Sequence, residues 1–146
     1  MVIVNKTVAH PWLCDVLGHL TTRHYVAMFD DASYHFLFNV FGWSGATDDA
    51  GERGWVDVRH VIEYLAEVAA GDVLEIRASM VKIGTKSVTA RYQMFNLGRD
   101  ELAATLECIY VLFDMNTRQS LALTDQLRQM VAEHLDPLED QEATQG

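Results

Sequence analysis

A short polar segment near the start of the sequence carries residue types that can do chemistry. The stretch "CDVLGHLTTRHY" combines a carboxylate, a glycine, a histidine and two threonines just before an apolar run: Asp15, Gly18, His19, Thr21 and Thr22. A carboxylate can attack an electrophilic carbon or activate a water molecule. The first N–H groups of a helix lack intrahelical partners and favour negative charge. The segment therefore predicts a polar site where a loop becomes a helix.

The residues that follow predict one long helix, from Thr22 to Phe41. Large and small apolar side chains recur along it at helical spacing: Tyr25, Phe29, Ala32, Phe36 and Val40. Other apolar residues widen this surface and leave only a narrow polar line: His24, Asp31, His35 and Asn39. A helix that is apolar around most of its girth must pack against a broad surface. A curved sheet wrapped around the helix would provide that surface.

The rest of the chain predicts an antiparallel sheet. One short strand precedes the polar segment, over residues 2–9, and a loop follows the helix, over residues 42–54. Four long strands with short turns come next, near residues 56–67, 72–83, 86–97 and 101–115. Short connections join antiparallel neighbours. A closing helix is expected over 123–135, with Thr124 as its N-cap. The pattern predicts an α+β fold in one domain, residues 1–135, with an acidic flexible tail over 136–146.

The polar segment and its surroundings resemble the hot-dog fold acyl-CoA thioesterases, close to the 4-hydroxybenzoyl-CoA thioesterase branch. In that family a strand leads into Asp-x-x-Gly-His-hydrophobic-Asn-Asn and then into an aromatic-rich helix that the sheet wraps. Residues 15–22 match this motif, except that Thr21-Thr22 replaces the asparagine pair. Tyr64, the Gly71-Asp72 pair, the "IGTKS" turn (83–87) and the last strand through Asp114 also match the usual layout of the family, and the resemblance spans about residues 5 to 130. The stretch "GHLTTRHYVAMFDDA" is further similar to thioesterases of carnitine and betaine breakdown.

The resemblance implies hydrolysis of a CoA thioester. Asp15 would act as nucleophile or base, Gly18 and His19 would shape the catalytic turn, and the backbone N–H of Thr22 would stabilise the oxyanion. Substrate contacts are expected from a larger set: Thr21, Arg23, Tyr25, Glu63, Lys82, Lys86 and Ser87. Two simpler interpretations stay open, in which Asp15 only caps a turn and Glu63 only faces solvent.

The resemblance also predicts partners. Sites that lie between two protomers imply a homodimer or homotetramer, and CoA enters only as part of the substrate. The CoA phosphates would meet a basic group on one predicted hairpin: Arg77, Lys82, Lys86 and Arg91. No metal is expected, because Asp31 and His35 have no apparent third ligand.

Two other functions are alternatives to hydrolysis. One is a hot-dog hydratase or dehydratase that acts on acyl thioesters. Its usual Asp-x4-His spacing differs from the Asp15-x3-His19 spacing found here. The other is a non-catalytic acyl-CoA-binding module, which would need no acid at the site.

Composition excludes other classes of function. The chain of 146 residues has a formal net charge of −10, which opposes nucleic-acid binding. The sequence has no run of about 18 apolar residues, the length that a membrane-spanning helix needs. Cys14 and Cys108 are far apart and suggest no disulfide framework, and the N-terminus does not resemble a signal peptide. A cytoplasmic location is therefore expected.

Overall fold

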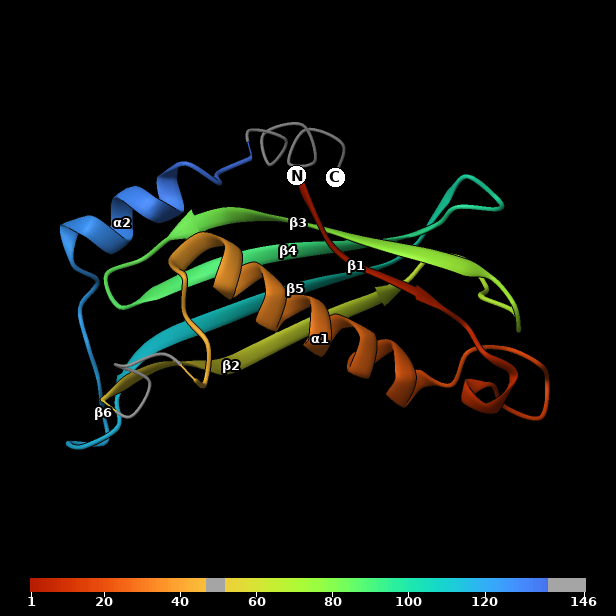
Figure 1. Ribbon diagram of the computed structural model, residues 1–146, viewed down its shortest axis with the longest axis horizontal. Helices are drawn as coiled ribbons and strands as arrows, with labels where there is room; N and C mark the ends of the chain where they lie inside the picture. Colours follow the sequence, from red (N-terminus) through yellow and green to blue (C-terminus); the bar gives the residue numbers. More distant parts are fainter. Residues whose placement is uncertain (47–51, 137–146) are drawn as a thin grey trace.

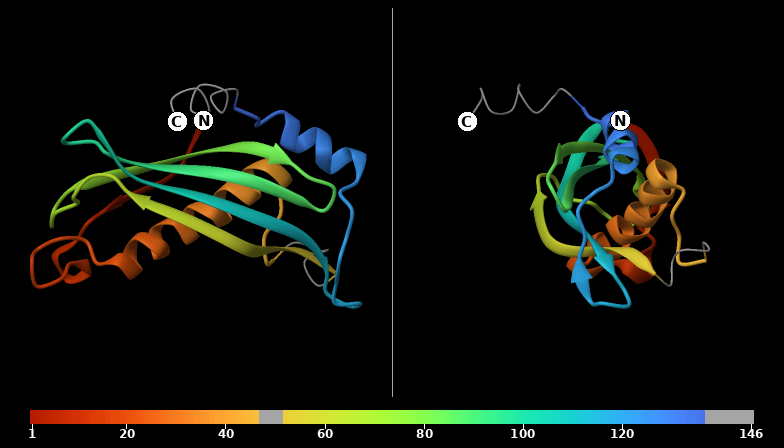
Figure 2. Two further views of the ribbon diagram at one scale, coloured as in Figure 1. Left: turned by 180° about the vertical axis from the view of Figure 1, so that it is seen from behind. Right: turned by 90° about the vertical axis from the view of Figure 1, so that its left-hand side faces the viewer.

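A curved antiparallel sheet wraps one long helix in the computed structural model, which describes residues 1–46 and 52–136 (Figures 1 and 2). The elements follow in the order β1 (Val2–Val8), η1 (Pro11–Leu13), α1 (Thr22–Phe41), β2 (Arg53–Tyr64), β3 (Val73–Ile83), β4 (Ser87–Asn96), β5 (Glu101–Asp114), β6 (Gln119–Ser120) and α2 (Asp125–Ala132). The strand order across the sheet is β1-β3-β4-β5-β2, and the short β6 pairs with β5. This architecture confirms the predicted α+β class and hot-dog arrangement.

The central helix begins and ends where its sequence pattern predicts. Phe29, Ala32 and Phe36 on α1 are at most 1% exposed and pack into the concave face of the sheet. Phe36 contacts the ring of Tyr92 on β4 edge to face, with ring centroids 5.8 Å apart. Gly42 ends the helix in the left-handed conformation, where a glycine has no steric penalty. The buried stripe fixes the orientation of α1 and hence of its N-terminus.

One face of the helix stays uncovered, contrary to the expectation of burial around most of its girth. Val26, Tyr34 and Phe38 on α1 are 38%, 57% and 57% exposed. A single sheet covers only about half of a helix surface, because it approaches from one side. The neighbouring edge strand β2 pairs only with β5 among the described residues. An apolar helix face therefore lies beside an open strand edge.

The other boundaries differ from the predicted ones by a few residues. The strand expected at 56–67 runs from Arg53 to Tyr64, because the chain leaves the sheet at Leu65 to cross towards β3. The prediction that this short connection joins antiparallel neighbours is wrong, since β4 and β5 lie between β3 and β2 in the sheet. The closing helix is shorter than predicted and ends at Ala132, with the Thr124 hydroxyl accepting a hydrogen bond from the Leu127 N–H at 3.2 Å. The elements η1 and β6, of three and two residues, were not predicted.

Two further expectations concern the acidic tail and the absence of a membrane span. The expected tail, 136–146, lies outside the described residues apart from its first residue, as does part of the 42–54 loop. Within the described ranges, no helix is long and apolar enough to cross a membrane.

Candidate active site

The polar segment folds into a tight turn closed by Asp15. The Asp15 N–H donates to the His19 carbonyl at 2.8 Å, and the Gly18 N–H donates to the Asp15 carbonyl at 3.0 Å. Gly18 has φ +80°, a conformation that other residues adopt only with strain. One carboxylate oxygen of Asp15, Oδ1, accepts the N–H groups of Leu17 (2.8 Å) and His19 (3.2 Å). The other oxygen, Oδ2, has no partner within the described residues and is available for chemistry.

The segment that joins β2 to β3 holds this turn in place. The Leu20 N–H donates to the Val68 carbonyl at 2.8 Å, and the Ala70 N–H donates to the Gly18 carbonyl at 3.1 Å. Cys14 and Leu20 form an antiparallel bridge across the base of the turn. These backbone bonds fix the position of the Asp15 turn relative to the first turn of α1.

The helix that follows presents free donors. Thr21 occupies the N-cap position with extended backbone, but its side chain caps no N–H group. The Thr22 backbone N–H, at the first position of the helix, also has no hydrogen-bond partner within the described residues. Free donors and the positive end of the helix dipole together suit a developing negative charge.

A cleft of about 390 Å³ opens beside this helix terminus. It is lined by residues from the Asp15 turn, the start of α1 and the end of β2: His19, Leu20, Thr22, Tyr25, Tyr64, Leu65, Ala66, Glu67 and Val68. The Tyr25 and Tyr64 rings meet edge to face, with centroids 5.0 Å apart. Burial and the neighbouring Tyr64 raise the pKa of Tyr25, so this phenol stays neutral at physiological pH. The cleft combines aromatic walls with a polar mouth.

The structure brings together one part of the predicted site. His19, Thr22 and Tyr25 line the cleft, and Asp15 and Gly18 form the turn that positions His19. Thr21 occupies the N-cap position of α1, outside the cleft lining. Arg23 lies on the exposed side of the first turn, where its Nε is 3.4 Å from the ring of His24.

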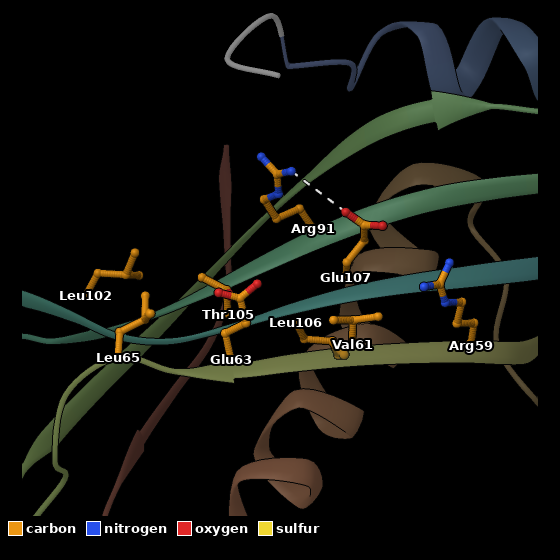
Figure 3. Close-up of a pocket in the computed structure, with 9 residues that line it drawn as sticks. All are labelled: Arg59, Val61, Glu63, Leu65, Arg91, Leu102, Thr105, Leu106 and Glu107. Atoms are coloured by element: carbon orange, nitrogen blue, oxygen red, sulfur yellow. Dashed lines mark ion pairs between the residues drawn. The ribbon is translucent and has the colours of Figure 1, made fainter. Parts of the chain in front are cut away.

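Glu63 lies apart from these residues, on the outer face of the sheet. It lines a second cleft, also of about 390 Å³, together with Arg59, Arg91 and Glu107. Figure 3 shows these side chains pointing away from α1, with the Arg91–Glu107 ion pair of 3.8 Å across β4 and β5. The strand alternation that turns Tyr64 towards the helix turns Glu63 away from it.

The predicted hairpin residues lie at the opposite end of the domain. Lys82, Lys86 and Ser87 surround the β3–β4 turn, beside the C-terminal end of α1 (Figure 1). A helix of 20 residues separates them from the Asp15 turn, a span of about 30 Å. Within one chain, these residues and Asp15 cannot contact the same thioester.

Six of the residues that line the cleft were absent from the predicted site, and two of these carry polar groups. Tyr64 and Glu67 both line it, and the Glu67 carboxylate is 3.5 Å from the His19 ring. Glu67 had been placed within a continuous strand, where it would point away from the helix. Gly71 indicates the turn into β3. A predicted strand that ended several residues before this glycine would have placed Glu67 in the connecting segment, where it could face the cleft.

The fold and the site together define a class. A long helix wrapped by a curved antiparallel sheet, with a carboxylate turn at its N-terminus, is the hot-dog arrangement of thioester hydrolases. The chain belongs to the Thioesterase-like superfamily, whose family model matches residues 9–133. This match confirms the predicted family and hydrolase class. No curated protein sequence matches the chain significantly.

Solved structures share the fold at low sequence identity. YbaW, a probable thioesterase from Escherichia coli, is 21% identical, with a TM-score of 0.77 over 90% of this chain and 98% of its own. SAV2348 from Staphylococcus aureus, solved in complex with CoA, is 18% identical, with a TM-score of 0.81 over 91% of this chain and 84% of its own. Slr0204 from Synechocystis, a 1,4-dihydroxy-2-naphthoyl-CoA thioesterase, is 14% identical, with a TM-score of 0.75 over 88% of this chain and 94% of its own.

Proposed function

We propose that this protein hydrolyses an acyl-CoA thioester to the free acid and CoA. The observation that carries the proposal is the arrangement around the cleft. An unpartnered carboxylate oxygen belongs to Asp15, in the turn that positions the cleft residue His19, and the unpartnered N–H belongs to Thr22, which lines the cleft. Thioester cleavage needs a nucleophile or base near the carbonyl carbon and a donor near its oxygen. The solved complex of SAV2348 with CoA shows that this fold accommodates CoA.

In the proposed mechanism, the thioester carbonyl oxygen accepts a hydrogen bond from the Thr22 N–H. Asp15 Oδ2 either removes a proton from the attacking water or attacks the carbonyl carbon itself. The carbon–sulfur bond then breaks and CoA leaves as the thiolate, which takes up a proton. In the direct route the acyl group remains on Asp15 as a mixed anhydride, which water hydrolyses to the free acid and the regenerated carboxylate. A single turnover in H₂¹⁸O can identify direct attack, because only an acyl–Asp15 anhydride opened by water at the Asp15 carbon places ¹⁸O in that carboxylate, whereas general-base catalysis places it in the acid product alone.

We further propose that the active unit is a dimer formed through the open edge of β2. Exposed apolar side chains cover this edge and the adjacent face of α1: Val56, Val58, Val61, Tyr34 and Phe38. Open edges with apolar surface pair readily with another strand. A two-fold axis at this edge would pair the β2 strands antiparallel and set the start of one beside the end of the other.

The same symmetry would complete the CoA site. The β3–β4 turn lies at the starting end of β2, since Ser87 pairs with Val111 and Val111 pairs with Val56. Antiparallel pairing would bring the partner's Lys82 and Lys86 to the end of the domain that holds Asp15. Both lysines are exposed and have no ion-pair partner within residues 1–46 and 52–136. They are therefore available for the phosphates of CoA, whereas Arg77 is paired with Glu75 at 2.8 Å.

The assembly is tested by charge substitution at the two sheet edges. Val58→Lys places a charge on the β2 edge, and Ile3→Lys places one on the opposite edge, at matched exposures of 57% and 54%. Light scattering should give at least twice the chain mass of 16.5 kDa for the wild type and Ile3→Lys, and a monomer with reduced turnover for Val58→Lys. A wild-type monomer with full activity would contradict the shared site.

The lining of the cleft favours a cationic acyl group. The rings of Tyr25 and Tyr64 and the carboxylate of Glu67 face one space, and aromatic faces with a nearby carboxylate attract quaternary ammonium groups. This agrees with the similarity to thioesterases of carnitine and betaine breakdown. The test compares trimethylammonioacetyl-CoA with its neutral isostere 3,3-dimethylbutyryl-CoA. A higher kcat/KM for the cationic substrate, lost in Glu67→Gln, is expected, and equal values would refute the charge preference.

Release of free thiol separates hydrolysis from the two alternatives. A panel of acyl-CoA substrates, with CoA detected by a chromogenic disulfide, should show turnover with at least one member. A hydratase would remove the enoyl absorbance without releasing thiol. A binding module would retain the acyl-CoA unchanged.

A further inference from the structure

A second cluster of reactive side chains lies on the inner face of the sheet, away from the thioester cleft. Asp57 and His60 on β2 and Cys108 on β5 each offer a ligand atom, and these atoms all lie within 4.8 Å of one another. The Asp57 Oδ2 and His60 Nε2 atoms are 2.9 Å apart. His60 precedes Tyr64 by four residues, which places the cluster about 13 Å along the strand from the cleft. It is therefore a separate site.

A β-bulge creates this cluster. In a regular strand, residues three apart point to opposite faces, so Asp57 and His60 would be separated by the sheet. The pairing register shifts between Asp57, opposite Tyr110, and Arg59, opposite Ile109. Val58 is the extra residue, and it turns Asp57 to the same face as His60, which is opposite Cys108. Bulges of this kind re-aim side chains beside functional sites.

The surroundings of the cluster also suit a bound cation. Cys108 is fully buried at the base, whereas the side chains of His60 and Asp57 are 34% and 38% exposed and leave an entrance. The Tyr110 hydroxyl hydrogen-bonds to the Cys108 sulfur at the base of the cluster. Asp30 on α1 lies close enough to Asp57 and His60 to interact electrostatically with both. Outer-shell donors of this kind commonly orient metal-bound thiolates.

We propose that Asp57, His60 and Cys108 form a binding site for a divalent transition metal, with Zn²⁺ as the best match. One thiolate, one imidazole and one carboxylate are the ligand types of zinc, and three protein ligands leave a fourth position for water or for Asp30. Zinc bond lengths of about 2.0–2.3 Å place tetrahedral ligand atoms about 3.3–3.7 Å apart. The three atoms need only small side-chain movements to meet this geometry. Binding would displace the thiol proton to solvent.

This site revises the expectation that the protein holds no metal. That expectation considered only Asp31 and His35 on α1. Asp57 and His60 are three residues apart, a spacing that predicts no shared face in a strand, and Cys108 is 48 positions further along the chain from His60. The cluster exists only because of the bulge and the β2–β5 register. It does not depend on the proposed thioesterase activity.

Titration of the metal-free full-length protein with Co²⁺ tests the site. The wild type should bind one Co²⁺ per chain with a near-ultraviolet thiolate-to-cobalt band, and Zn²⁺ should abolish that band. Cys108→Ser and His60→Ala should each lose it. The matched controls Cys14→Ser and His35→Ala should retain it.

His60 is partly exposed, so His60→Ala keeps the test informative if the buried Cys108→Ser variant fails to fold. Circular dichroism verifies the fold of every variant. A folded wild type without the charge-transfer band would overturn the proposal, as would a band of unchanged intensity in folded His60→Ala.

Discussion

Replacement of Asp15 by asparagine separates the chemistry of this carboxylate from its structural role. Asp15 Oδ1 accepts two backbone N–H groups within its own turn, from Leu17 and His19. An asparagine side chain offers a carbonyl oxygen in the same position, so both hydrogen bonds can persist. The substitution removes only the negative charge and the basic second oxygen. The variant should therefore fold and assemble as the wild type does.

The expected kinetic effect is large. Loss of a positioned base or nucleophile lowers turnover by about two orders of magnitude or more, or at least about 2.7 kcal/mol of transition-state stabilisation. The assay measures release of the free CoA thiol at a saturating concentration of the best substrate of the panel. Mass spectrometry of the purified variant checks that the new amide has not reverted to the acid.

Asp15→Ala is the matched control for structure. It removes both acceptor contacts as well as the charge, at a cost of about 0.5–1.5 kcal/mol for each hydrogen bond. In a chain of this length, 1 kcal/mol shifts the melting temperature by about 2–4 °C. Asp15→Ala should therefore melt several degrees below Asp15→Asn, with similarly low turnover. Near wild-type turnover by folded Asp15→Asn would refute the catalytic assignment and leave Asp15 as a turn-closing residue.

Further predictions concern the hairpin and the cysteines. Replacing Lys82 and Lys86 together by alanine should raise KM at nearly constant kcat, because these charges contribute binding energy that ground state and transition state share. Raised salt should have the same effect on the wild type, since it screens exposed charges. Lys6→Ala is the control, and an unchanged KM in the double variant would place the CoA phosphates elsewhere. Burial raises the pKa of Cys108 to about 12, so in metal-free native protein at pH 8 only Cys14 should react with a thiol reagent, and two equal thiol signals would contradict this burial. Since the unfolded thiol releases its proton near pH 9 and the folded one does not, the free energy of unfolding should fall by about 1.4 kcal/mol per pH unit between pH 9 and 10, measured by urea denaturation. Above pH 10 the fall should steepen, because burial also raises the pKa values of Tyr92 and Tyr110, whose phenols release protons only in the unfolded chain.

The sequence predicted the fold to within a few residues because each element carries its own periodic signal. The apolar stripe of Tyr25, Phe29 and Phe36 sets both the limits and the orientation of α1. Glycine-containing turns separate the long strands, and the turns between β3 and β4 and between β4 and β5 join antiparallel neighbours as predicted, whereas β2 and β3 are not neighbours in the sheet. The errors fall where that signal stops. The end of β2 is set by backbone bonds of the 65–70 segment to Ala103 and to the Asp15 turn, which depend on the assembled fold.

The site was predictable only where its residues are neighbours in the chain. Asp15, Gly18 and Thr22 belong to one turn and one helix start, so their spacing alone brings them together. Glu63 and Glu67 show the opposite case. Their positions differ by four residues, but one faces the outer cleft and the other the thioester cleft, because the strand ends between them.

The proposed metal site and the proposed dimer edge, both on β2, have a common physical origin. This strand is at the edge of the sheet, so only β5 constrains its register on one side, and a bulge at Asp57 and Arg59 costs a single row of hydrogen bonds. The bulge turns Asp57 towards His60 and Cys108, and the free edge exposes Val58, the inserted residue. A second copy that pairs along this edge must match the bulge in its own strand. Metal binding and dimer formation would then be linked, and each should stabilise the other. The reason is that a metal ion bound by Asp57 and His60 would fix the shape of the bulge, and hence the register at which the two β2 edges meet.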